Sequence, residues 1–318
     1  DQLGDPVPRG WLKSLAGEAS TFTDAGSGRR QLAEQISRAD NPLTARVYVN
    51  RVWHWLFGTG IVATPSDFGL LGDRPSHPEL LDWLTSRFID DGWSTKKLVR
   101  RILLSQVWQQ SGTVSSRALS VDPKNRLLHH YATRRLEAEA IRDSMLAVSG
   151  GLDATLFGPV IDPHRANEDP KKRLFSGPID GNGRRSIYTK ITIMEAPQFL
   201  SLFNQPKPKI PTGRRDVSST PSQSLALLND PFVKGQSQIW SSRLVSSAHA
   251  SPRDRIAHML TIAFAREPLP GEIDRWEEAV TDLSTLHDVA AGQIMQDVAV
   301  WSDVAHAVFN TKEFIYVR

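Results

Sequence analysis

The chain has 318 residues, of which 40% are hydrophobic and 23% are charged, and this globular composition excludes wholesale disorder. A net charge of only +3 is far from the balance of nucleic-acid-binding proteins, so we expect no nucleic-acid partner. The absence of cysteine excludes disulfide scaffolds, cysteine-ligated zinc, thiol nucleophiles and covalently attached c-type haem. No apolar run reaches the roughly 18 residues of a transmembrane helix, so we expect no membrane span.

Residues 1–28 read as a linker, because proline and glycine punctuate a mostly polar stretch. They carry neither an initiator methionine nor the pattern of an export signal, and we interpret the chain as a fragment of a longer protein. Helical patterns with capping residues follow, and we expect helices at 29–39, 43–57, 79–91, 95–110 and 134–149.

Residues 151–195 interrupt this pattern with Gly-Pro, Asp-Pro and Gly-Asn-Gly turns. The stretch SIYTKITIM at 186–194 is rich in β-branched residues and is the best strand candidate. Helical patterns return at 197–203, at 221–228 continuing toward 245, and at 252–264, 270–283 and 301–310. The sequence therefore predicts a mainly α domain over 29–318, with helical halves 29–150 and 196–318 around a loop-rich, partly β middle segment.

Arg46, Asn50 and His54 recur every four residues and share one side of the helix predicted at 43–57. This helix is apolar on several sides, which is typical of a buried helix. Buried polar side chains must find partners, so the three residues form either a structural network or the wall of a pocket.

Glu137 falls within an apolar stripe of the helix predicted at 134–149, where a carboxylate is costly unless a cation accompanies it. Arg134, Arg135, or Arg46 from another helix could supply that cation, and Arg46 would join Glu137 to the polar network above. Glu137 is therefore either half of a structural ion pair or a general acid or base with a raised pKa.

The densest polar stretch is TGRRDVSSTPSQSLALLND at 212–230. Exposed N–H groups at a helix start beside two guanidinium groups would suit a sulfate, phosphate or uronate. The alternative is an ordinary helix cap with solvated arginines. The candidate anion-binding residues are Arg214, Arg215, Ser218, Ser219 and Thr220.

Asp67 and His77 lie in a loop over 64–79 and are a second candidate acid/base pair, although the sequence does not show that they meet. Their alternative roles are to cap a turn and to begin a helix. The chain contains no HExxH motif, no Walker A loop and no GxSxG elbow, and we expect no metal site from a linear motif.

Several long blocks in order resemble one family of C-terminal domains from large exported proteins of planctomycetes and related bacteria. These blocks are NPLTARVYVNRVWHWLFGTGIVATPSDFG, HPELLDWLTSRFIDDGWSTKKLVRRILLSQVWQQS, RRLEAEAIRDSMLAVSGGLD, TGRRDVSSTPSQSLALLNDPFV and AVFNTKEFIYV. The family is the planctomycete secreted domain, a domain of unknown function, and the similarity runs from about Val7 to the C-terminus. Leu269-Pro270-Gly271-Glu272 departs from the family's usual Pro-Thr-x-x-Glu helix start.

The resemblance implies export to the periplasm or cell surface and a parent protein with a separate cytochrome c-like domain. Any haem would then belong to that upstream domain, so we expect no cofactor in this chain. The other domains of the parent protein would be its partners. The family supplies no catalytic residues that can be carried over to this sequence.

Two functions remain open from the sequence. The first is a binding or scaffold module that recognises an anionic polysaccharide or a partner domain through the arginine-rich loop. The second is a hydrolase or lyase on complex glycans, with Glu137, Asp67 or His77 as acid/base and the arginines as an anion clamp. A redox partner of a haem domain ranks last, because no ligand set for a redox centre is present.

Overall fold

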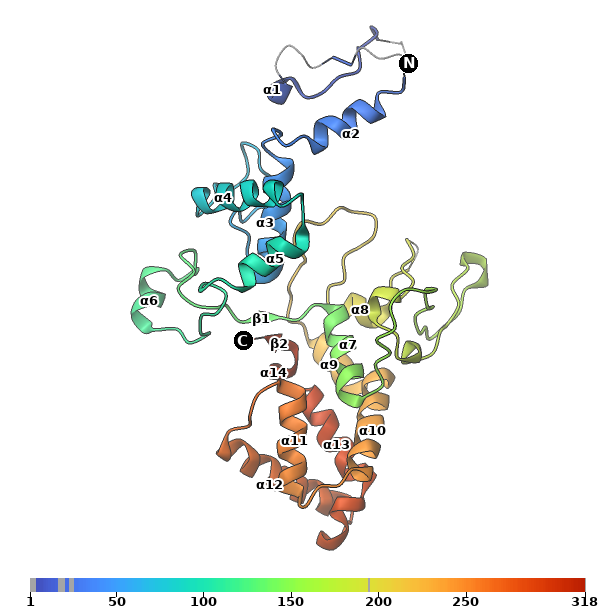
Figure 1. The fold of residues 1–318 in the computed structure, drawn as a ribbon. Helices are drawn as coiled ribbons and strands as arrows, with labels where there is room; N and C mark the ends of the chain where they lie inside the picture. Colours follow the sequence, from blue (N-terminus) through green and yellow to red (C-terminus); the bar gives the residue numbers. More distant parts are fainter. Residues whose placement is uncertain (1–3, 17–20, 23–25, 194, 318) are drawn as a thin grey trace. The chain divides into compact units, whose positions relative to one another are not determined.

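The structure is a computed structural model that describes residues 4–16, 21–22, 26–193 and 195–317 (Figure 1). It is mainly α, as predicted, and the sheet found in these residues has two short strands. The chain divides into two compact units, 1–132 and 133–318, each with its own hydrophobic core. The division falls inside the first predicted helical half, 29–150.

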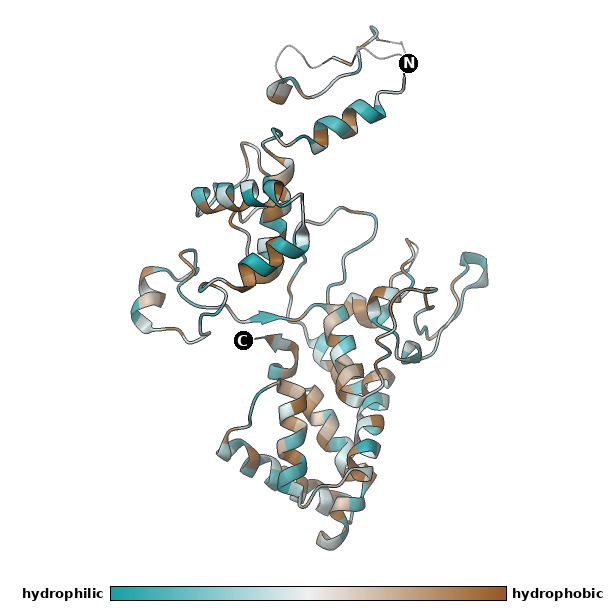
Figure 2. Ribbon diagram, viewed as in Figure 1, coloured by the Kyte–Doolittle hydropathy of each residue, from teal (hydrophilic) through white to brown (hydrophobic). Residues whose placement is uncertain are grey.

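The first unit contains α1 (Lys13–Ala16), α2 (Arg29–Ser37), α3 (Thr44–Phe57), α4 (Pro78–Asp90), α5 (Thr95–Leu103) and α6 (Ser116–Val121). Its core lies among α3, α4 and α5, where Val49, Trp53, Leu84 and Leu98 are almost completely buried. Each of these helices buries apolar side chains in this core and also carries hydrophilic residues along its length (Figure 2), as helices packed at a surface do.

The second unit contains α7 (Ala138–Ser149), α8 (Gln198–Leu202), α9 (Pro221–Asn229), α10 (Pro231–Ser246), α11 (Pro252–Phe264), α12 (Pro270–Leu286), α13 (Val298–Phe309) and α14 (Lys312–Ile315). Helices α10 and α13 form its centre, where the Trp240 and Phe309 rings stack with centroids 5.3 Å apart. Helix α7 packs on α10, so a buried face of α7 extends this core.

Strands β1 (Arg134–Arg135) and β2 (Tyr316–Val317) pair antiparallel, with Arg134 opposite Val317 and Arg135 opposite Tyr316. The helix predicted at 134–149 therefore begins only at Ala138, because the two arginines before it are extended. The helical pattern predicted to continue from 221 toward 245 also breaks, at Asp230. Asp230 has an extended backbone because Pro231 follows it, and its side chain caps the next helix.

The strand predicted at 186–194 is wrong for the described residues. Ser186–Tyr188 form a single 3₁₀ turn, and Thr189 makes only an isolated bridge with Ile161. The backbone N–H and hydroxyl of Ser186 both donate to Asp143 Oδ1 at 2.7 Å, so the first N–H of the predicted strand bonds to a helix side chain and not to a neighbouring strand. β-branched composition alone does not supply such a neighbour.

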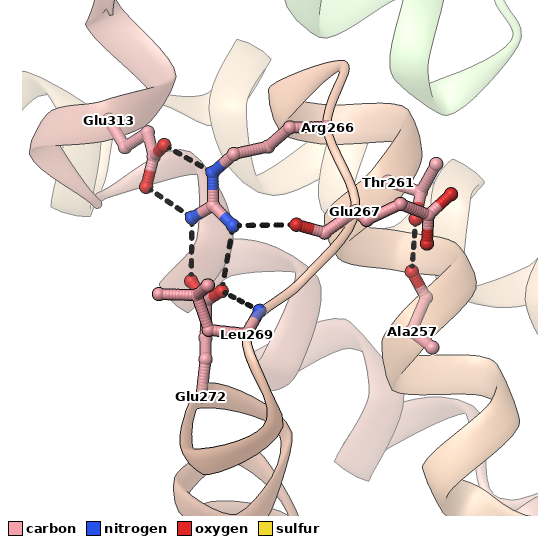
Figure 3. Close-up of polar contacts among 7 residues, drawn as sticks. All are labelled: Ala257, Thr261, Arg266, Glu267, Leu269, Glu272 and Glu313. Atoms are coloured by element: carbon pink, nitrogen blue, oxygen red, sulfur yellow. Dashed lines mark hydrogen bonds and ion pairs between the residues drawn. The ribbon is translucent and has the colours of Figure 1, made fainter.

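Arg266 lies in the loop between α11 and α12 and contacts one carboxylate of α12 and one of α14 (Figure 3). Its guanidinium contacts both oxygens of Glu313, at 2.7 and 2.8 Å, and both oxygens of Glu272, at 2.9 Å. The carboxylates of Glu313 and then Glu272 raise the pKa of Arg266 above its ordinary value. Glu272 also accepts the N–H of Leu269 at 3.1 Å, so it completes the helix start that departs from the family pattern.

We expect Arg266→Lys to destabilise the unit 133–318 by about 1–3 kcal/mol, because one ammonium cannot bridge both carboxylates in bidentate fashion. Urea unfolding followed by circular dichroism measures this loss. Arg253 is the control, since it also contacts two carboxylates but is more exposed. Arg253→Lys should shift the unfolding midpoint less than Arg266→Lys does, because water screens exposed ion pairs. Equal midpoints for the wild type and Arg266→Lys would contradict the assignment.

Candidate functional site

The three polar residues predicted to share a side of α3 bond to different groups. Asn50 is completely buried and holds the loop after the helix, because its amide donates to the Val62 carbonyl at 3.0 Å and accepts the Val62 N–H at 2.8 Å. Arg46 is half-buried and its Nε donates to Asp82 at 2.7 Å. His54 is buried and lies against the edge of Trp55.

Asp67 and His77 lie at separate places in the first unit's loop. Asp67 Oδ1 accepts the Gly69 N–H at 2.8 Å, which closes a tight turn. His77 stands directly before α4 and its Nδ1 lies 3.0 Å from the Ser76 hydroxyl. These contacts suit the structural alternative for each residue, and the acid/base role stays a prediction.

Glu137 and Arg215, which the sequence singles out for separate reasons, contact one another in the second unit. Glu137 precedes α7, and Arg215 Nη2 lies 3.5 Å from its Oε2, while Arg215 Nη1 donates to Glu139 Oε2 at 2.5 Å. Burial raises the pKa of the Glu137 carboxyl, and the Arg215 charge opposes this shift. One arginine therefore balances two carboxylates.

The remaining candidate anion-binding residues surround the start of α9. Asn204 organises this loop, since its Oδ1 accepts from Arg135 Nη2 at 2.6 Å and from the Ser218 hydroxyl at 3.1 Å. The Thr220 N–H donates to Gln223 at 3.3 Å, which is half of a capping box. The side chains of Arg214 and Ser219 are exposed.

A cavity of about 530 Å³ opens in the second unit, among the irregular segment 161–181, α8, and the junction of α9 with α10. This volume lies in the roughly 300–1,000 Å³ range of small-molecule sites. Its buried lining, which forms the floor, includes Arg142, Leu200, Ala226 and Phe232. Its more exposed lining, which forms the rim, includes His164, Gln198, Phe199, Ser222, Leu225, Asn229 and Asp230.

Arg142 holds the floor in place. Its Nη1 donates to the Arg184 carbonyl at 3.0 Å and to the Ser186 hydroxyl at 3.1 Å, and its Nη2 donates to the Asp180 carbonyl at 2.6 Å. The guanidinium also lies over the Phe232 ring, 5.3 Å from its centroid. Gly181, which lines the cavity, has a φ of +60°, and a Cβ there would lie 2.7 Å from Arg142 Nη2.

Asp230 is the most unusual ionisable group of the cavity. Its Oδ1 accepts the Phe232 N–H at 2.9 Å and so caps α10. Burial raises the pKa of the Asp230 carboxyl above its ordinary value, while the Phe232 hydrogen bond and the His164 charge oppose the shift. Asp162, which also lines the cavity, is balanced by Lys190 at 2.9 Å.

A family model described as PSD1, protein of unknown function (DUF1553), matches residues 28–280. The chain belongs to this family. No curated protein and no solved structure gives a significant match. All the residues that line the cavity fall within the part of the chain that the PSD1 model matches.

The site residues predicted from the PSD1 sequence and the lining of the cavity are different sets. Among the described residues that line the cavity, none belongs to the predicted acid/base or anion-binding sets. The sequence signal for Asp230 is the Asn-Asp-Pro step, which reads as a helix cap, and His164 lies in a stretch that reads only as turns. The sequence alone does not distinguish an aspartate that only caps a helix from one that also lines a cavity.

In the part of the PSD1 chain that the structure describes, no helix combines the length and the apolar composition of a membrane span. No group of three or more His, Asp or Glu side chains there is arranged to hold a metal ion.

We expect Asp230→Asn to stabilise the chain at about pH 8, by an amount that shrinks toward about pH 4. The folded state binds the Asp230 proton more tightly than the unfolded state does, so the stability of the wild type falls as pH rises above the ordinary aspartate value. Asparagine keeps the cap without the charge. Urea unfolding across this pH range measures the difference.

Asp297→Asn is the matched control, because Asp297 caps α13 through the Val300 N–H at 2.8 Å and lies outside the lining of the cavity. A pH-independent difference between Asp230→Asn and the wild type, or one of opposite sign, would show that burial does not govern the Asp230 carboxyl.

Proposed function

We propose that the chain is the ligand-binding module of an exported multidomain protein, and that its cavity takes a short saccharide. The observation that carries this proposal is the combination of an apolar floor with a polar rim. The half-buried Phe199 ring lines the cavity and meets the buried Phe232 ring edge to face, with centroids 5.5 Å apart, so Phe199 offers the apolar surface on which a sugar ring can lie.

The rim supplies the polar groups that such a ligand needs. Gln198, Ser222 and Asn229 are exposed at the cavity and offer amide and hydroxyl groups, which both donate and accept hydrogen bonds. A few polar groups around an apolar cavity are the usual composition of a ligand site. A polyhydroxylated ring uses both features at once.

Blocking the cavity mouth tests this proposal. Ser222 and Ser224 are both exposed residues of α9, but only Ser222 lines the cavity. Calorimetric titration with neutral, amino, uronic and sulfated oligosaccharides should find at least one ligand class. We expect Ser222→Trp to weaken its binding about ten-fold or more, and Ser224→Trp to leave it unchanged.

Two results would overturn the proposal. One is a panel in which no oligosaccharide binds the wild-type chain. The other is a ligand that binds Ser222→Trp as tightly as the wild type, because that ligand would occupy another surface.

Anionic polysaccharide is the second ligand class, and the arginine-rich loop is its proposed contact. Arg214 is exposed and makes no ion pair with a described residue, whereas Arg215 already faces two carboxylates. We expect Arg214→Ala to weaken binding of a sulfated polysaccharide by about two- to five-fold at low salt. A neutral polysaccharide is the control, and an unchanged affinity for the sulfated one would remove Arg214 from the contact.

A glycan hydrolase or lyase is the alternative, and one observation favours it: the Glu137 carboxyl has a pKa raised by burial and an arginine beside it. Sampling the same oligosaccharide mixtures for shortened products tests this reading. Products that form with the wild type but not with Glu137→Gln would support the hydrolase or lyase alternative. Oligosaccharides that stay intact with the wild type would contradict this alternative.

A further inference from the structure

The cavity contains one carboxylate whose charge no strong cation balances. Four ionisable residues line it, namely Arg142, Asp162, His164 and Asp230. Asp162 is paired with Lys190, and Arg142 is occupied by backbone carbonyls and by Asp143, whose carboxylate lies 3.6 Å away. Asp230 remains.

Asp230 has an oxygen to offer a ligand. Its Oδ1 is taken by the Phe232 N–H, whereas its Oδ2 accepts no hydrogen bond from a described residue. Among these residues, the His164 ring is the one side-chain charge that acts on it. His164 is exposed at the rim, where water weakens its effect.

The surroundings of Asp230 strengthen its electrostatic attraction for a cation that binds there. Phe199, Leu225 and Phe232 place apolar surface around it, and electrostatic attraction is stronger beside such surface than in open water. Half-buried carboxylates are stabilised by a cation that can also donate hydrogen bonds. A primary ammonium group fits, because it carries three donors and no acceptor.

We infer that the cavity selects a saccharide bearing a free amino group, with Asp230 as the counter-ion of its ammonium. This inference rests on the proposed function, since it names the class of saccharide that the same cavity holds. The rim favours an amino sugar over a bare lysine chain. Gln198, Ser222 and Asn229 provide several hydrogen-bonding groups, which the hydroxyls of a sugar ring can use and the methylene stem of a lysine cannot.

Two oligosaccharides of equal length, one with free and one with acetylated amino groups, test the contribution of the ammonium to binding. We expect a glucosamine tetramer to bind the full chain about ten-fold or more tightly than an N-acetylglucosamine tetramer at about pH 7, because acetylation removes the charge. Calorimetry measures both affinities. Asp230→Asn should abolish the preference, and Asp297→Asn, which alters a helix cap outside the cavity lining, should retain it.

The outcomes separate this inference from the proposed function. If the acetylated tetramer binds as tightly as the amino tetramer and Ser222→Trp weakens both, the cavity holds saccharides and the ammonium inference fails. A preference that survives in Asp230→Asn also overturns it. If a lysine-containing peptide shows the Asp230-dependent binding while neither tetramer binds, the saccharide assignment fails together with the inference.

Discussion

The buried guanidinium of Arg142 is the constraint on which the cavity depends. The described residues between α7 and α8 form short 3₁₀ turns and isolated bridges, so few repeating backbone hydrogen bonds fix their shape. Arg142 replaces them by donating from α7 to the carbonyls of Asp180 and Arg184. Hydrogen bonds to a charged donor contribute about 1.5–3 kcal/mol each, enough to hold a short irregular loop in one conformation. A cationic side chain from within a helix thus holds the irregular segment that borders a ligand-sized space.

Arg142, Arg215 and Arg266 of the second unit have different partners, and these partners determine which carboxylate remains for a ligand. Arg266 and Arg215 each contact two carboxylates, so these arginines and their partners largely cancel one another. Arg142 is satisfied mainly by neutral carbonyls, and its donors are directed at the loop. The one guanidinium in the otherwise apolar floor described above therefore offers little free charge to a ligand. Asp230 at the junction of α9 and α10 carries the charge that a ligand would meet.

Local sequence patterns predicted the helices, whereas the failed strand and the contacts between candidate site residues depend on residues far apart in the sequence. Ser94 and Ser251 cap α5 and α11, and Gly150 ends α7, because capping depends on neighbours within a few residues. The β-branched run after Arg185 failed as a strand because Ser186 bonds to Asp143, more than forty residues away, and the next residues form a 3₁₀ turn with a single bridge to Ile161. Glu137 and Arg215 were each singled out, yet only the fold showed that they meet. Asp230 was not singled out, because the helical pattern from 221 was expected to continue through it toward 245, whereas it caps α10.

The short pairing of β1 with β2 has a mechanical consequence. Arg134 lies opposite Val317, so the chain enters and leaves the unit 133–318 at the same end of the two-residue ladder. A pull applied through both ends would open this ladder one residue pair at a time, since the load falls on its outermost hydrogen bonds first. Unzipping of this kind needs little force compared with shearing a packed helix. The ladder would therefore open before the packed helices of the unit 133–318 begin to separate.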